Sequence, residues 1–94
     1  MRISILSDIH SNYEALVSAL ALSQQLRADK VYCLGDIVGY GGNPNECVNL
    51  IRENVSYSVL GNHDLAIIDT SHARYLSRHG KATAEWTRGI LTKN

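Results

Sequence analysis

Short apolar runs alternate with longer amphipathic segments over the first two thirds of the chain. Three runs are compact and stop at turn residues: residues 2–7, 31–34 and 56–60. A short, largely apolar run bounded by Asp or Gly is typical of a buried strand in a parallel sheet. The pattern therefore predicts three strands.

The segment after the first run has the signals of an amphipathic helix. Ser11 and Glu14 are spaced as a capping box, in which the two side chains bond to backbone N–H groups at the start of a helix. A stripe of small or apolar residues then recurs at steps of three and four: Leu16, Ala19, Leu20, Ser23 and Leu26. We expect this helix to end at about Arg27.

A second helix is predicted between the second and third runs. Asn43 suits the N-cap, Pro44 suits the first helical position, and Glu46 completes another capping box. The helix should run from residue 44 to about 53. One side of it is apolar, with Cys47, Val48 and Ile51.

The last third of the chain is less regular. Residues 64–69 are expected to form a short helical piece, and residues 81–91 a longer helix. The inner face of the longer helix should carry Ala82, Trp86 and Ile90, with Trp86 as an anchor of the core.

The alternation of strands and helices predicts an α/β fold. Strand–helix–strand units in series form a parallel βαβαβ sheet with right-handed crossovers. Residues 1–94 are expected to make a single domain of three strands with alternating helices, followed by a helical tail. A chain of this length builds only a small core.

Charge and cysteine content narrow the classes of function. Nine basic and nine acidic residues balance, and no run of like charges exceeds two, which argues against nucleic-acid binding. We expect no membrane partner and a cytoplasmic location, because no apolar stretch approaches roughly 20 residues and the start of the chain lacks a signal-peptide pattern. Cys33 and Cys47 lie at apolar positions without CxxC spacing, which predicts buried thiols.

A polar cluster follows each predicted strand. The three clusters are Asp8-Ile9-His10, Gly35-Asp36 with Gly39, and Gly61-Asn62-His63-Asp64. Each of them alone is an ordinary turn sequence. Ligands of parallel sheets collect beyond the carboxyl ends of the strands, and all three clusters fall there. Their coincidence predicts one shared site.

Carboxylate, amide and imidazole groups at one edge indicate divalent metal ions. Two ions about 3.5 to 4 Å apart can stabilise the attacking and leaving oxygens of a phosphoryl displacement. We expect Asp8 and His10, at alternate positions of an extended segment, to hold one ion. Asp36 is the candidate bridge between the two ions, and the Asn62 carbonyl oxygen is the candidate ligand of the other.

The two residues after Asn62 are candidates for the catalytic machinery. His63 could stabilise the transferring group or protonate the leaving oxygen. Asp64 could fix the tautomer of His63. With water activated by the ions, this set predicts metal-dependent hydrolysis of a small phosphate ester.

The same motifs resemble those of a known family. Asp8-x-His10, Gly35-Asp36-x-x-Gly39 and Gly61-Asn62-His63-Asp64 are similar to the first three motifs of the calcineurin-like metallophosphoesterase superfamily. The phrases around them resemble a branch of small bacterial and archaeal phosphoesterases. The resemblance implies a four-layer α/β/β/α sandwich, a binuclear centre of Mn, Fe, Ni or Zn, and hydrolysis of phosphomonoesters or phosphodiesters.

The sequence departs from that family in its later motifs. The family adds a further histidine and a Gly-His-x-His motif, which this sequence lacks. His72 and His79 lie in a polar stretch and are expected to face solvent. The resemblance therefore implies a truncated domain, the amino-terminal part of a phosphoesterase. We expect it to hold one metal ion or none, to hydrolyse esters weakly, and to form homo-oligomers through an exposed sheet surface.

Two other functions stay open on the sequence. One is a catalytically impaired metal-binding or assembly module that keeps the phosphoesterase scaffold. The other is a nucleotide-binding domain that uses Gly39-Tyr40-Gly41-Gly42 as a phosphate loop. The second is weaker, because these glycines form neither GxGxxG nor a P-loop and follow the second strand rather than the first.

Overall fold

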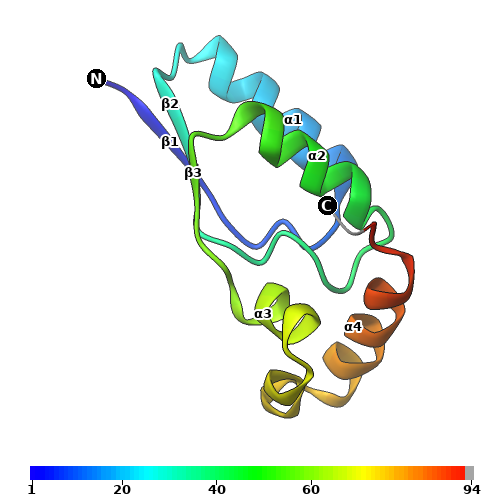
Figure 1. The fold of residues 1–94 in the computed structure, drawn as a ribbon. Coiled ribbons are helices and arrows are strands. Elements are labelled where there is room, and N and C mark those ends of the chain that lie inside the picture. The colour runs from blue at the N-terminus through cyan, green and yellow to red at the C-terminus, as the bar shows by residue number, and fades with distance from the viewer. Residues whose placement is uncertain (93–94) are drawn as a thin grey trace.

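Three short parallel strands form the centre of the molecule. The computed structural model describes residues 1–92, apart from the side chains of residues 70, 73 and 75. The strands are β1 (Ile3–Leu6), β2 (Lys30–Cys33) and β3 (Tyr57–Ser58), in the order β1-β2-β3 (Figure 1). Ile5 pairs with Tyr32, and Tyr32 pairs with Tyr57. The predicted parallel βαβαβ arrangement is confirmed, although β1 and β3 are shorter than their apolar runs and β2 is shifted by one residue.

Two helices cover one face of this sheet. They are α1 (Tyr13–Gln25) and α2 (Pro44–Asn54), which lie side by side (Figure 1). The core joins both helices to the strands through one buried cluster: Ile9, Leu16, Cys33, Cys47 and Ile51. Both cysteines are free and buried, as the sequence predicts.

The caps of these helices differ from the predicted capping boxes. Asn12, not Ser11, is the N-cap of α1, and its Oδ1 accepts a hydrogen bond from Ala15 N at 3.2 Å. Ser11 does not cap this helix, since its buried hydroxyl has no hydrogen-bond partner. Asn43 is the N-cap of α2, but its Nδ2 donates to Glu46 Oε2 at 2.6 Å instead of the side chain accepting from a backbone N–H.

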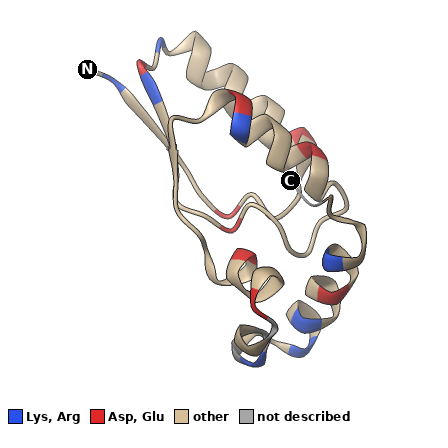
Figure 2. Cartoon of the chain, in the orientation of Figure 1, with Lys and Arg blue, Asp and Glu red and all other residues tan. Residues whose placement is uncertain are grey.

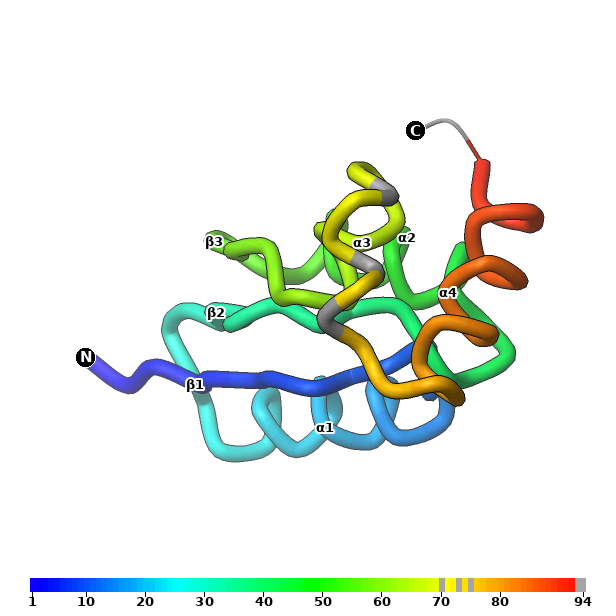
Figure 3. Tube along the Cα trace, turned by 90° about the horizontal axis from the view of Figure 1, so that it is seen from below, coloured from blue at the N-terminus to red at the C-terminus, as the bar shows by residue number. Residues whose placement is uncertain are grey.

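The opposite face of the sheet carries exposed apolar side chains. Alternate residues of a strand point to opposite faces, so the residues that do not face α1 and α2 line up across the strands: Ile3, Ile5, Tyr32, Leu34, Tyr57 and Val59. Ile5 is 62% exposed and Tyr57 is 74% exposed. Within residues 1–92, a single three-stranded sheet is formed rather than the whole four-layer sandwich; Figure 3 shows its strands side by side, and Figure 1 shows α1 and α2 on one side of it.

The last third of the described chain makes a small helical layer beyond the carboxyl ends of the strands. It consists of α3 (Asn62–Ile68), the 3₁₀ helix η1 (Thr70–Tyr75) and α4 (Arg78–Ile90). Ala66, Leu76 and Ala84 form its buried cluster. No helix in the described part of the chain has the length and apolar character needed to cross a bilayer.

The buried face of α4 is not the predicted one. Gly80, Ala84 and Thr87 are its buried residues, whereas Trp86 is 51% exposed and Ala82 and Ile90 are also exposed. The expectation that Trp86 anchors the core is therefore wrong. The helix begins three residues earlier than predicted, and the small residues at steps of four and three are the ones that pack toward the cluster with α3.

Candidate metal centre

The loop after β1 lies alongside the loop after β2. Three backbone N–H groups of residues 8–11 donate to carbonyls of residues 35–37: Asp8 to Gly35 at 3.3 Å, His10 to Asp36 at 2.9 Å and Ser11 to Ile37 at 2.8 Å. These bonds continue the pairing of the two strands into the loops. They place the first two polar clusters side by side.

The first cluster is not extended, which corrects the sequence-based expectation. Asp8, His10 and Ser11 have φ values of 55°, 48° and 60°, and Asp36 has a φ of 54°. Left-handed backbone at residues other than glycine is uncommon and gathers at functional sites. The tight turns, not the alternation of a strand, bring Asp8 and His10 toward Asp36.

Two glycines let the loop after β3 reach the same place. A Cβ on Gly61 would overlap Asp36 N and Oδ1, and a Cβ on Gly35 would overlap Gly61 N. Gly35 also has a φ of 99°, which favours glycine. The backbones of the two loops can approach this closely only because neither residue has a side chain.

Three metal-binding side chains converge where the loops after β1 and β2 pair. Donor atoms of Asp8, His10 and Asp36 all lie within 4.8 Å of one another. Figure 2 shows acidic segments next to each other in the loops that leave β1 and β2. His10 Nδ1 lies 3.1 Å from Val38 O, and His10 Nε2 lies 3.4 Å from Asp8 Oδ1. A proton on Nδ1 would donate to the Val38 carbonyl and leave the Nε2 lone pair for a metal ion.

The charge state of Asp8 suits this role. The Ser7 hydroxyl donates to Asp8 Oδ2 at 2.8 Å, and this bond, together with His10 nearby, holds the pKa of the Asp8 carboxyl below its usual range. Asp8 is exposed, while His10 and Asp36 are half-buried. The cluster is therefore open to solvent on the Asp8 side.

Asn62 lies beside Asp36. As placed, its amide oxygen faces only hydrogen-bond acceptors, whereas the reversed amide would donate to both Asp36 oxygens at 3.1 Å. The Asn62 amide is therefore within hydrogen-bond distance of both oxygens of the Asp36 carboxylate. Carboxylate, imidazole and amide groups brought this close together are ligands that first-row divalent ions accept. The donor set therefore fits a metal ion.

His63 is buried beside this cluster. Its backbone N–H donates to Asp36 Oδ1 at 3.0 Å, and its ring centroid lies 4.8 Å from that of His10. Burial, with a smaller electrostatic contribution from the neighbouring His10, lowers the pKa of His63, which favours the neutral imidazole. His63 Nδ1 is buried and has no hydrogen-bond partner.

A role in fixing the His63 tautomer would require Asp64 to contact a ring nitrogen of His63. The Asp64 carboxylate instead binds two backbone N–H groups. Its Oδ1 accepts from Val38 N at 3.0 Å and its Oδ2 accepts from Gly61 N at 3.1 Å. Asp64 is buried and joins the loop after β2 to the loop after β3. In this structure it positions backbone rather than the His63 imidazole.

Sequence reasoning missed Tyr40 at this site. The Tyr40 ring contacts the rings of His10 and His63, with centroid distances of 5.1 and 4.7 Å. His79 faces solvent as expected, but it also stacks on Tyr40 at 5.7 Å. His72 is half-buried, with its Nε2 3.6 Å from Asp69 Oδ2. The available sequence signal for Tyr40 was its position between Gly39 and Gly41.

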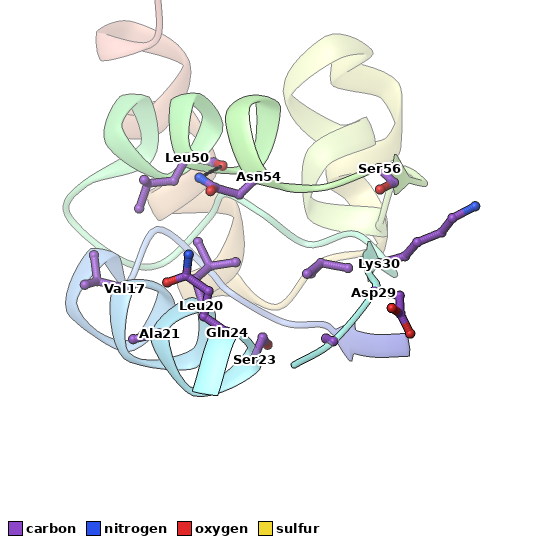
Figure 4. A pocket seen from close by; sticks show the side chains of 12 residues that line it. Val17, Leu20, Ala21, Ser23, Gln24, Asp29, Lys30, Leu50, Asn54 and Ser56 are labelled. Atoms are coloured by element: carbon purple, nitrogen blue, oxygen red, sulfur yellow. Dashed lines mark hydrogen bonds between the residues drawn. The ribbon is translucent and has the colours of Figure 1, made fainter. Parts of the chain in front are cut away.

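Two pockets differ in their relation to the cluster. One borders it and includes Asp8, His10 and Tyr40 among its lining residues. The other lies at the opposite edge of the sheet, between the ends of α1 and α2 (Figure 4). Its only carboxylate, Asp29, accepts a hydrogen bond from Arg2 N at 2.6 Å. Of these two pockets, the first is therefore the one that gives access to the metal-binding side chains.

Comparisons with known proteins agree with this geometry. The family described as calcineurin-like phosphoesterase matches residues 1–92. A crystal structure of a metallophosphoesterase from Sphaerobacter thermophilus superposes with a TM-score of 0.75 and 42% identity, over 99% of this chain and 37% of that chain.

Two curated relatives are also similar. An uncharacterised protein of Methanocaldococcus jannaschii is 45% identical over 89 residues, which are 95% of this chain and 37% of that protein. A symmetrical bis(5'-nucleosyl)-tetraphosphatase of Haemophilus influenzae is 42% identical over 45 residues, 46% of this chain and 16% of that protein. The chain thus spans little more than a third of the length of the relatives that match nearly all of it.

Proposed function

Because the chain belongs to the calcineurin-like phosphoesterase family, we propose that its strand-end loops form one side of a metal centre for the hydrolysis of phosphate esters. The convergence of Asp8, His10 and Asp36 donor atoms within 4.8 Å carries the proposal. Carboxylate oxygen and imidazole nitrogen together suit first-row divalent ions, among them Mn, Fe, Ni and Zn.

The proposed roles follow from the positions of the side chains. Asp8 and His10 would hold one ion, Asp36 would lie between two ions, and Asn62 would offer its amide oxygen to the second. Bound divalent ions would supply Lewis acidity toward the phosphoryl group and acidify water. The backbone bond from His63 N to Asp36 Oδ1 would keep one carboxylate oxygen oriented.

His63 would act on the substrate as a neutral group. Its lowered pKa, caused mainly by burial, favours an imidazole without charge near neutral pH. A neutral ring can donate one hydrogen bond to a phosphoryl or leaving oxygen. Asp64 would support it indirectly, through the backbone of the loops that carry Val38 and Gly61.

A metal-binding module without turnover is the second candidate. Among residues 1–92, the cluster supplies two carboxylates, one imidazole and the nearby Asn62 amide. This set suits one ion better than two, since a catalytic zinc ion, for example, has three protein ligands. We infer that full hydrolysis needs donors in addition to these residues.

The glycine loop is poorly suited to cradling phosphate. Gly41 N already donates to His10 O at 3.0 Å. A Cβ on Gly39 would come within 2.9 Å of His63 Nδ1. These glycines are thus used for close packing against two histidines, which favours the metal centre over a nucleotide loop.

The remaining parts of the proposal concern substrate and assembly. A small phosphate ester fits the balanced charge, and a bis(5'-nucleosyl) tetraphosphate belongs among the test substrates because one relative bears that name. We propose a cytoplasmic location and homo-oligomers that cover the exposed sheet face, which carries Ile5 and Tyr57.

Calorimetric titration of the chain with Mn²⁺, with hydrolysis of bis(p-nitrophenyl) phosphate measured in parallel, tests the proposal. Asp36→Asn should weaken Mn²⁺ binding at least as much as the roughly 10- to 100-fold that loss of a ligand-orienting residue costs. Glu53→Gln, an equivalent change at an exposed position on α2, should bind as the wild type does.

The outcomes separate the two candidates. Turnover above that of free Mn²⁺, even if weak, that Asp36→Asn abolishes supports the esterase, and Mn²⁺ binding with no detectable turnover supports the module. If the wild type and Asp36→Asn take up Mn²⁺ equally, or neither does, the proposed metal centre is wrong.

A further inference from the structure

The loop that carries Tyr40 is packed against both histidines of the candidate centre. Tyr40 has a φ of 60°, and the glycines on either side of it have no room for side chains. A Cβ on Gly39 would meet the His63 ring, and a Cβ on Gly41 would overlap His10 O. The backbone of this loop is thereby fixed between His10 and His63.

The Tyr40 ring lies against both imidazoles. It meets His10 nearly edge to face, at an interplanar angle of 81°, and His63 at 49°. The rings of His10 and His63 also meet each other at 79°. Aromatic rings at centroid distances of 4.5 to 7 Å attract one another in such arrangements. The three rings form one packed group.

His63 depends on this packing more than His10 does. His10 has a hydrogen-bond contact from Nδ1 to Val38 O, but His63 Nδ1 has no partner. Asp64 is engaged with two backbone N–H groups and supplies no bond to that nitrogen. Ring contacts and the close approach of Gly39 are what hold the His63 imidazole.

The same tyrosine ring extends to α4. His79 stacks on it at 21° between the ring planes. A Cβ on Gly80 would lie 3.1 Å from the Tyr40 hydroxyl oxygen, closer than ordinary contact. Residues 40 and 79 are far apart in sequence, so this contact couples the helical layer to the loops at the sheet edge.

We propose that Tyr40 is a positioning residue that orients the His10 and His63 imidazoles and transmits the position of the start of α4 to them. The metal-related part of this inference rests on the proposed function, but the orientation of the rings does not. Tyr40 would act through the two histidines and not on the substrate.

Nuclear magnetic resonance of the metal-free full chain tests the orientation. The readout is the order parameter of the His10 and His63 ring Cε1–H groups. Tyr40→Ala should lower both order parameters, and Tyr40→Phe, which keeps the ring, should preserve them. Tyr13→Ala is the matched control, since Tyr13 has similar exposure but lies at the start of α1.

Mn²⁺ titration supplies the second readout. Tyr40→Ala should weaken binding about tenfold, in the range found for residues that orient metal ligands, and Tyr40→Phe should restore it. If the wild type binds no Mn²⁺, the proposed function fails, while the order parameters still decide the role of Tyr40. Unchanged order parameters in a folded Tyr40→Ala variant would overturn the inference.

Two glycine variants test the link to α4 without removing Tyr40. Gly80→Ala puts a methyl group against the tyrosine hydroxyl, whereas Gly89→Ala adds one where nothing lies within 4 Å. Gly80→Ala should shift the His10 and His63 ring resonances, and Gly89→Ala should leave them in place. Equal spectra for the two variants would exclude the coupling, including in the case where Tyr40→Ala does not fold.

Discussion

At the scale of single residues, the glycines shape the site as much as the metal-binding side chains do. Gly35 and Gly61 let two loops touch backbone to backbone, and this contact carries Asp36 toward Asn62 and His63. The polar residues would be ordinary turn residues if the loops were held apart.

Adding a methyl group at the loop crossing should therefore damage the site. In Gly61→Ala the new Cβ overlaps the Asp36 backbone and carboxylate, and such overpacking costs about 1 to 3 kcal/mol of unfolding free energy. Chemical denaturation and Mn²⁺ titration measure the two losses. Gly42→Ala, at a loop position with nothing within 4 Å, should change neither; equal effects of both variants would contradict the argument.

The buried thiol of Cys47 should make stability depend on alkaline pH. Burial, with smaller contributions from Glu46 and Glu14, raises its pKa from 9.0 to about 11. Above pH 9 the unfolded chain loses this proton while the folded chain keeps it, so the unfolding free energy falls as pH rises.

The difference between wild type and Cys47→Ala isolates that contribution. A shift of one pKa unit corresponds to about 1.4 kcal/mol, so the wild type should lose about 1 kcal/mol more than the variant between pH 8 and pH 10. Urea denaturation at several pH values measures it. Parallel pH profiles of the two proteins would show that the thiol does not titrate as stated.

At the scale of elements, α3 is held in place by α4. Arg88 lies on α4, and its Nη2 donates to Ala66 O at 3.0 Å while its Nε donates to Ile67 O at 3.3 Å. These carbonyls belong to the end of α3, where intrahelical partners run out. Since α3 begins at Asn62 and contains His63, the arginine supports the site from a distance.

Removing the guanidinium should loosen α3. Arg88→Met keeps much of the apolar stem but loses both bonds, and hydrogen bonds to charged groups contribute about 1.5 to 3 kcal/mol each at most. We expect a loss of about 2 kcal/mol in total, measured by thermal unfolding, because the group is only half-buried. Lys81→Met on the exposed part of α4 is the control, and an equal loss there would refute the explanation.

Features that depend on residues close together in the sequence could be predicted, and features that depend on contacts between distant segments could not. The order of the strands and the polar turns after them depend on neighbouring residues, so the local sequence predicts them, although the strands end one or two residues before their apolar runs do. The expectation that Trp86 is buried is wrong, because packing against α3 decides which face of α4 is buried. The contact of Tyr40 with His79 joins distant segments, and no local pattern contains it.

At the scale of the molecule, the described chain leaves one face of its sheet exposed. Ile5, Leu34, Tyr57 and Val59 present apolar surface there, and each is more than half exposed. A parallel sheet is ordinarily covered on both faces. This imbalance supports the proposal of self-association.

Polar substitutions on this face should reduce that association. Ile5→Thr combined with Tyr57→Thr removes apolar area and places a β-branched threonine at each position, which strands accept. Sedimentation velocity should show larger assemblies for the wild type and a shift toward monomer for the variant. Val17→Thr with Leu22→Thr, at exposed apolar positions on α1, is the control; a monomeric wild type would contradict the proposal.

The backbone bonds between residues 8–11 and residues 35–37 have a consequence for solvent exchange. They join segments without regular secondary structure through the same kind of pairing as the strands before them. Protection of amide protons against exchange with D₂O depends on how readily such bonds open, and not on whether the residue lies in a strand or in a loop. The amides of His10 and Ser11 should therefore exchange as slowly as those of β1, so that the most chemically active loops would be among the slowest parts of the chain to open.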